Sequence, residues 1–285
     1  MTDTPIHSRY EHGKLRRISL PVGGIGTGTI GFGGRAELRD FQVSNRPATG
    51  FRPELAAMVM RVEDTTGVRA RLLEGPLDDA EFDGDLGSSA ANHGMPRFRS
   101  ASFGAAYPFG SVTLTDPDMP TVDVEAFNPL IPADLGASSI PAVVLRYRIT
   151  NDTENEMRVS IAASFENFVG ADGTANVVGG NTNAYRESSR LAGIVMTAPE
   201  LAGSHEAAGT FVFSTIRNGG DVSHRTGWKD ADWSNTYLDF WDDFLEDGLL
   251  EDHASNRPRP FGSVTNEIRV PAGRTEELSF LLRSE

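Results

Sequence analysis

A glycine-rich segment near the N-terminus has a spacing that binds phosphate in other proteins. Residues 26–31 read Gly-Thr-Gly-Thr-Ile-Gly, which matches the G-x-G-x-x-G string of dinucleotide-binding folds. That chemistry needs a buried strand before the string and a helix after it. Here Pro21 precedes the string, residues 32–34 continue the glycine run, and no helical pattern of apolar residues follows. We therefore predict a structural glycine hairpin and no cofactor.

Acidic side chains gather in two segments that could hold a cation or supply catalytic acids. Residues 79–84 place oxygen-bearing side chains like the start of a calcium loop, but Ala90 stands where such a loop needs a bidentate glutamate. The six histidines stand singly and there is no cysteine, so we expect no metal site. In segment 234–249 the acids alternate with aromatic residues, which is typical of the solvated face of a helix rather than of a catalytic carboxylate pair. These acids are Asp239, Asp242, Asp243, Glu246 and Asp247.

The composition restricts the classes of partner. The 285 residues carry a formal net charge of -14, which disfavours nucleic acid and anionic membranes because both select basic surfaces. No apolar run approaches the roughly 20 residues that span a bilayer, so we expect no integral membrane segment. Residues 1–10 lack the basic and apolar regions of an export signal, and a cytoplasmic location is therefore expected.

Short segments of alternating apolar and polar residues recur along the chain and are separated by turn-forming residues. This period of two is typical of half-buried strands, and many such strands predict an all-β fold, a large antiparallel β-sandwich in one unit over residues 1–285. The predicted strands are 55–62, 109–115, 121–127, 142–150, 158–165, 193–198, 210–216, 262–270 and 276–282.

Three further expectations concern the connections. Residues 143–150 and 157–164 are joined by a short polar segment and are predicted to pair as an antiparallel hairpin. Residues 77–103 and 170–190 are rich in Gly, Ser, Asn and charge, and are expected to be long loops. Segment 234–249 is predicted to be a short helix whose apolar positions at helical spacing are Leu238, Trp241, Leu245 and Leu249.

Five segments, taken in order, resemble landmarks of glycoside hydrolase family 116, which contains β-glucosidases and non-lysosomal glucosylceramidases. They are residues 20–47, 125–132, 138–142, 164–170 and 241–248. The resemblance implies an N-terminal β-sandwich that precedes an (α/α)6 catalytic barrel, and it places the nucleophilic glutamate and the acid/base aspartate in that barrel. The 285 residues contain only the sandwich, so no catalytic residue is transferred and the chain alone is expected to be inactive. Its expected partner is the catalytic domain, in cis or as a separate chain.

A polar cluster follows the glycine run. Arg39, Asp40, Asn45 and Arg46 could form bidentate contacts to a neighbouring domain, and we treat this interdomain brace as one hypothesis. A local salt-bridge network within the sandwich is the equal alternative.

A different class of function is also open. The chain could be a stand-alone carbohydrate-binding or scaffolding module, in which aromatic side chains form a platform for a sugar ring. The candidates for that platform are Tyr107, Trp228 and Trp233.

Overall fold

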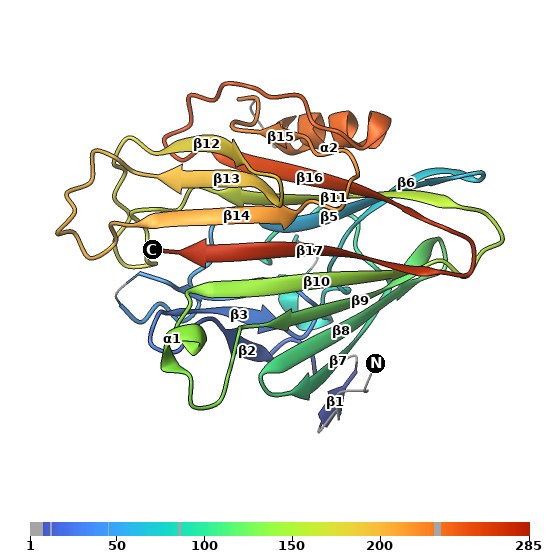
Figure 1. Cartoon of the computed structure of the whole chain (residues 1–285), viewed down its shortest axis with the longest axis horizontal. Helices are drawn as coiled ribbons and strands as arrows, with labels where there is room; N and C mark the ends of the chain where they lie inside the picture. The colour runs from blue at the N-terminus through green and yellow to red at the C-terminus, as the bar shows by residue number, and fades with distance from the viewer. Residues whose placement is uncertain (1–7, 12, 45, 85–86, 231–234) are drawn as a thin grey trace.

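The strands of the protein form three antiparallel sheets (Figure 1). The computed structural model describes residues 8–11, 13–44, 46–84, 87–230 and 235–285. Within them the largest sheet has nine strands, the second has five and the third has three. The predicted all-β fold with large antiparallel sheets is therefore confirmed.

The nine-stranded sheet forms one complete layer. Along each strand the side chains alternate between the core and the outside, as β10 shows with buried Val143, Leu145, Tyr147 and Ile149. In spatial order its strands are β1 (Ser8–Tyr10), β7 (Ser100–Ala106), β8 (Phe109–Asp116), β9 (Met119–Phe127), β10 (Ala142–Thr150), β17 (Thr275–Ser284), β14 (Thr210–Ile216), β13 (Leu191–Thr197) and β12 (Thr182–Glu187).

The two smaller sheets face the inner side of this layer. Phe32 of the three-stranded sheet contacts Phe103 of β7 with ring centroids 6.2 Å apart, so the glycine-rich strands belong to the common core. The five-stranded sheet has the order β15 (His224–Arg225), β16 (Phe261–Val270), β11 (Met157–Glu166), β5 (Ala56–Asp64) and β6 (Gly67–Leu72). The three-stranded sheet has the order β2 (Ser19–Val22), β3 (Thr29–Gly33) and β4 (Leu38–Gln42).

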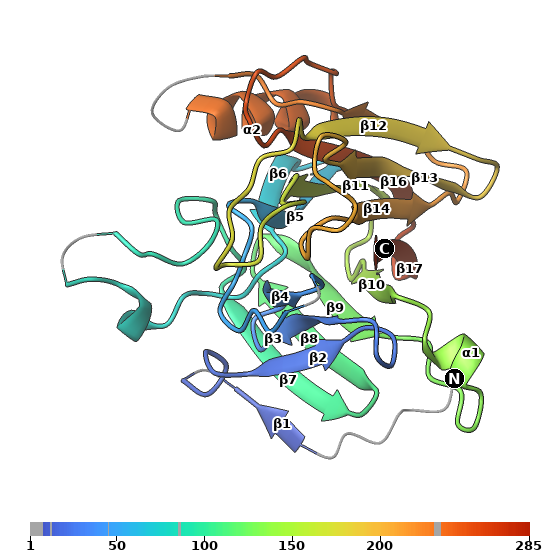
Figure 2. The same ribbon diagram turned by 90° about the vertical axis from the view of Figure 1, so that its left-hand side faces the viewer.

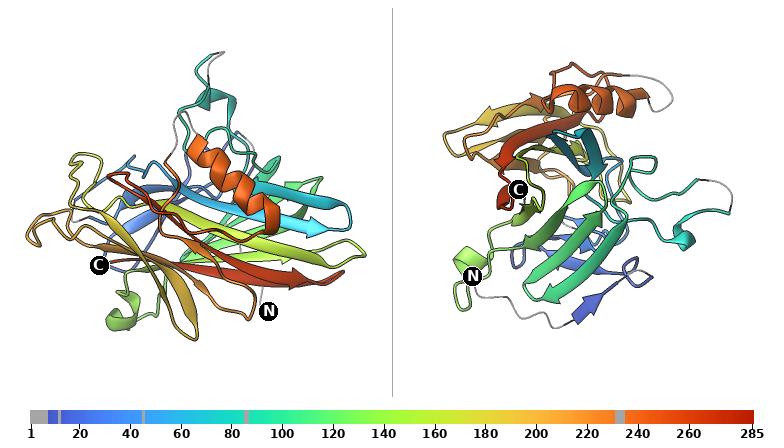
Figure 3. Two further views of the ribbon diagram at one scale, coloured as in Figure 1. Left: turned by 90° about the horizontal axis from the view of Figure 1, so that it is seen from above. Right: turned by 90° about the vertical axis from the view of Figure 1, so that its right-hand side faces the viewer.

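Helix α2 (Asn235–Asp247) lies on the outer face of the five-stranded sheet (Figure 3). A second apolar core separates them, in which Trp228 stacks on Phe240 with ring centroids 4.2 Å apart. The helix is where the sequence predicted it, but its buried face is different, because Phe240 and Phe244 are buried whereas Leu238 is 58% exposed. The remaining helices are short: α1 (Leu135–Ser138) and the 3-10 turn η1 (Asp79–Glu81). Among the described residues no helix has the length and apolar character needed to cross a membrane.

The predicted hairpin between residues 143–150 and 157–164 is wrong. Strand β10 pairs with β9 and β17, whereas β11 pairs with β5 and β16 in the other layer. The connection between them therefore crosses from one sheet to the other instead of turning within one. The side chain of Asn151 fixes this crossing, because its Nδ2 donates to the carbonyl oxygen of Val270 at 2.9 Å.

Both segments expected to be long loops contain regular structure. Residues 77–103 include η1 and the first half of β7, and Figure 2 shows that the described part of the stretch between β6 and β7 stands out from the sheets. Residues 170–190 include strand β12 at the edge of the large sheet. The sequence therefore located irregular regions but missed the short strands inside them.

Candidate functional site

The glycine run forms the turn between β2 and β3, as predicted. The two strands pair antiparallel with Val22 opposite Ile30, and β3 continues to β4 without a helix. This excludes the dinucleotide-binding arrangement. Gly28 has φ +88°, and a Cβ there would lie 2.5 Å from the carbonyl oxygen of Gln42. Only glycine satisfies both the positive φ and the close approach of the two backbones.

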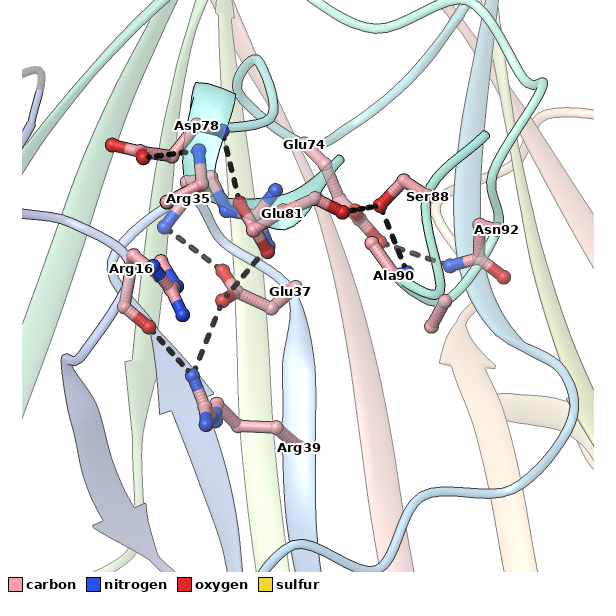
Figure 4. Close-up of polar contacts among 12 residues, drawn as sticks. Arg16, Arg35, Glu37, Arg39, Glu74, Asp78, Glu81, Ser88, Ala90 and Asn92 are labelled. Carbon is pink, nitrogen blue, oxygen red and sulfur yellow. Dashed lines mark hydrogen bonds and ion pairs between the residues drawn. The ribbon is translucent and has the colours of Figure 1, made fainter. Parts of the chain in front are cut away.

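A buried ion-pair network fills the turn between β3 and β4. Figure 4 shows Arg35 between two acids, with its Nη2 3.3 Å from Oε1 of Glu37 and 3.0 Å from Oε1 of Glu81. The backbone nitrogen of Arg35 also donates to Glu37 at 2.9 Å. Burial raises the pKa of Glu37, although the charge of Arg35 opposes this effect. The network ties the segment that stands out between β6 and β7 to the glycine-rich sheet.

The predicted brace residues Arg39 and Asp40 lie next to this network. The Nε of Arg39 donates to Oδ2 of Asp40 at 3.2 Å, and Asp40 also accepts from Ser19 and from the backbone of Gly50, each at 2.6 Å. Burial acts to raise the pKa of Asp40, but these hydrogen bonds and the charge of Arg39 lower it below its ordinary value. Both side chains therefore have partners within the sandwich, as in the local-network alternative.

Arg46 lies apart from this pair and reaches a different part of the chain. Its Nη1 is 3.5 Å from Oδ2 of Asp172, its Nε is 3.2 Å from Oε2 of Glu206, and its side chain is 43% exposed. The fourth predicted brace residue, Asn45, lies outside the described residues. The structure thus joins Arg39 to Asp40 and gives Arg46 separate partners.

Two surface hollows border the glycine turn, and a third lies beside β7. One of about 270 Å³ lies between Thr27 and Glu285, and one of about 450 Å³ shares Thr27 and extends to Arg46. A third, of about 520 Å³, lies beside β7 at Arg99 and includes Glu11. Each of these three hollows is lined by at most one acidic residue. Glycoside hydrolysis ordinarily needs two carboxyl groups that flank the scissile bond, so none of them has the required pair.

Of the three aromatic residues considered for a sugar platform, the two that the structure describes lie in different parts of the sandwich. Tyr107 lies in the turn between β7 and β8 and is 68% exposed. Trp228 has no exposed surface, and its Nε1 donates to Oγ of Ser263 at 2.7 Å beneath α2. It cannot stack on a sugar without disruption of this core. Trp233 lies outside the described residues.

The calcium-like segment has a structural role in the described residues. Asp78 caps η1: its Oδ1 accepts from the backbone nitrogen of Ala80 at 3.0 Å, and Oε2 of Glu81 accepts from the backbone nitrogen of Asp78 at 2.9 Å. Within the part of the chain that the structure describes, no group of three His, Asp or Glu side chains could hold a metal ion.

Two buried arginines that the sequence did not single out hold α2 in place. Arg61 donates to the carbonyl oxygens of Leu245 and Glu246 at 2.9 and 3.0 Å, at the end of the helix where a cation is favoured. Arg225 contacts Asp239 and Asp243, both at 2.9 Å. Arg61 follows five apolar residues of β5, and an arginine after such a run was the one signal available for it; Arg225 lies beside His224 in the two-residue strand β15 and had no comparable signal.

Most of this sequence matches the model of a known protein family. Residues 19–283 match the family model described as beta-glucosidase 2, glycosyl-hydrolase family 116 N-term. This chain belongs to glycosyl hydrolase family 116. The match begins at β2 and ends in β17, so it includes the glycine-rich sheet, both larger sheets and α2.

Two solved structures are similar over nearly the whole chain. A putative kojibiose phosphorylase from the human microbiome covers 97% of this family 116 chain with 6% identity and a TM-score of 0.39. A polysaccharide lyase covers 98% of it with 8% identity and a TM-score of 0.42. The chain spans 25% of the length of the first protein and 32% of the second.

Proposed function

We propose that this chain is the non-catalytic N-terminal domain of a retaining β-glycosidase, of the β-glucosidase or glucosylceramidase type, and that it braces the catalytic domain. The observation that carries this proposal is the match of residues 19–283 to a domain described as the N-terminal part of a glycosyl hydrolase. The three hollows described above support it, since each is lined by at most one acidic residue.

A brace has to be stiff where it contacts its partner. The ion pairs of Arg35 and Arg39 and the hydrogen bonds of Asp40 fix the glycine-rich sheet, since they tie its strands to neighbouring segments. Arg39 and Arg46 keep 29% and 43% of their side chains exposed. Guanidinium groups bind carboxylates in bidentate geometry, so these two arginines are the proposed contacts of the brace.

The proposal is tested by hydrolysis of chromogenic β-glycosides. We expect no turnover by the purified chain and turnover when the catalytic domain, produced as a separate chain, is added. Turnover by this chain alone would overturn its non-catalytic assignment. A catalytic domain that is equally active and equally stable without the chain would overturn the bracing role.

A stand-alone carbohydrate-binding module is the competing proposal, and the exposure of Tyr107 favours it. Tyr107 precedes Phe109, whose ring lies 5.2 Å from that of Phe127 on the outside of the large sheet. Calorimetric titration with glucose oligosaccharides distinguishes the two proposals. Binding that disappears in Tyr107→Ala would favour the module, whereas no binding by the native chain would exclude it.

A further inference from the structure

The outer face of the nine-stranded sheet is uncovered in the described part of the chain. In Figure 1 its central strands lie in front, and no helix crosses them. On this face a row of apolar or small side chains crosses five strands at matched register. The row consists of Phe127, Val144, Leu281, Ser214 and Gly193.

A second row runs parallel to the first, two residues further along each strand. It contains four apolar residues and one charge, and it consists of Ala142, Arg283, Val212, Val195 and Ala184. The two rows together are called the apolar band below. The connection that carries α1 leads into Ala142 and presents three more apolar side chains to solvent, because Ile131, Leu135 and Ile140 are 51%, 75% and 43% exposed.

The same strands have a different character at their other end. There the outward residues at matched register are Asp123, Arg148 and Glu277, followed by Thr121, Thr150 and Thr275. An antiparallel sheet with one face in water normally carries polar residues along that whole face. The apolar band departs from this pattern: its larger apolar side chains are half-buried and keep part of their surface in water, while Ser214 between them is 8% exposed. An apolar surface that crosses several strands marks an interaction site.

The dimensions of the band suit one α-helix. Strands lie about 4.8 Å apart, so five of them span about 19 Å, and the two rows are about 7 Å apart. A helix of about 13 residues is about 20 Å long. On its other face the sandwich is already covered by such a helix, because α2 has 13 residues and packs Phe240 and Phe244 on the five-stranded sheet.

The charged residues of the two outer faces can also be compared. On the covered face, a strand arginine, Arg225, binds two aspartates of α2. On the uncovered face, Arg283 is the one charged residue of the band, with its side chain 52% exposed and an ion pair to Glu285. A helix that packs on the band would therefore place a carboxylate opposite Arg283.

We propose that the apolar band is the docking site for an amphipathic α-helix of the catalytic domain, with an acidic residue of that helix paired with Arg283. This inference rests on the proposed bracing function and locates its main contact. The family match ends at residue 283 in β17, so the polypeptide that follows this domain in the family leaves from the strand that carries Leu281 and Arg283. A catalytic domain joined at that strand would be tethered next to the band.

The experiment measures the affinity between this chain and the separately produced catalytic domain by calorimetry. Leu281→Glu places a charge in the band and is expected to weaken binding about 100-fold, as a buried apolar anchor does. Thr275→Glu is the matched control, because it adds the same charge to the polar end of the same strand, and less than about a threefold effect is expected there. Arg283→Glu is expected to weaken binding about tenfold and to reduce its dependence on salt. Thermal unfolding of each variant shows whether it has folded.

The outcomes separate the band from the bracing function. If the native chain does not bind the catalytic domain, both proposals are wrong. If the native chain binds the catalytic domain and the folded Leu281→Glu variant binds it equally well, the proposed docking site is wrong, while the proposed bracing function is retained. Sedimentation of the native chain tests a second copy as the occupant: a dimer that Leu281→Glu dissociates, with unchanged binding of the catalytic domain, would also overturn the proposal.

Discussion

The two outer faces of this sandwich both carry apolar side chains, but they differ in how these side chains are covered. On the five-stranded sheet, α2 covers an apolar surface and encloses Trp228 completely. On the nine-stranded sheet, the apolar band around Leu281 and Val144 has no cover among the described residues. The described residues thus supply a cover for one face only, and we infer that the other face is reserved for a partner domain.

The largest expected effect tests the covered face. Trp228→Ala removes a fully buried ring that stacks on Phe240, and it should lower the free energy of unfolding by about 3–5 kcal/mol. Urea denaturation followed by fluorescence and circular dichroism measures this loss. The control is Leu238→Ala on the exposed side of α2, with a change of about 0.5 kcal/mol or less. Equal losses in the two variants would contradict the packing of α2 described above.

A smaller effect is expected from the arginine that anchors α2. Arg225→Ala leaves Asp239 and Asp243 without their buried cation and should cost about 2–3 kcal/mol. Hydrogen exchange of the backbone amides of α2 should accelerate more than exchange in β10, because the helix loses its attachment while the large sheet does not. Uniform acceleration in both elements would show that Arg225 stabilises the whole sandwich instead.

The covered face should also respond to pH through Asp239. Burial acts to raise the pKa of this carboxyl, but Arg225 and Lys229 lower it below its ordinary value. A carboxyl group whose pKa is lowered by folding stabilises the folded state at pH values above its unfolded pKa of about 3.9. This stabilisation is lost as the pH falls through the pKa of the folded state. Asp239→Asn should therefore cost about 1 kcal/mol at pH 7 and less at pH 3. A cost that does not change between these pH values would contradict this role.

The smallest effect is expected on the uncovered face, where neighbouring leucines of β17 form a matched pair. Leu281 points outward and is half-buried, so Leu281→Ser should cost about 0.5 kcal/mol in the chain alone. Leu282 points into the core and is 1% exposed, so Leu282→Ser should cost about 3 kcal/mol. Chemical denaturation compares the two variants. Similar costs would mean that the band is already covered in the chain alone.

The sequence predicted the strands well because the evidence for a strand is local. The predicted segments 142–150 and 210–216 coincide with β10 and β14, and the helix at 234–249 contains α2. The partners of the strands were harder to predict. The polar connection after residue 150 reads like a hairpin turn, but Asn151 there bonds to Val270, more than 100 residues away in the chain.

The contacts of the candidate site residues were also hard to predict from the sequence. Arg39 and Asp40 were selected from the sequence as a polar cluster, but their contacts with Arg16 and Gly50 depend on how the chain returns to them. Trp228 was selected for its aromatic ring, and its burial depends on Phe240 of α2. Arg61 and Arg225 were missed because the groups of α2 that they contact lie 184 and 14 residues away in the sequence, so no local pattern indicates these contacts.

The sequence by itself determined the all-β class, the alternation of inward and outward residues, the glycine turn and the family. These properties depend on neighbouring residues, which set the backbone preferences and the period of two along each strand. The tertiary structure decided which strands pair, which aromatic residues are buried, and that outward residues of five strands form one apolar band. Each of these depends on contacts between distant segments, such as Ala142 opposite Arg283, and no local pattern specifies such a pair.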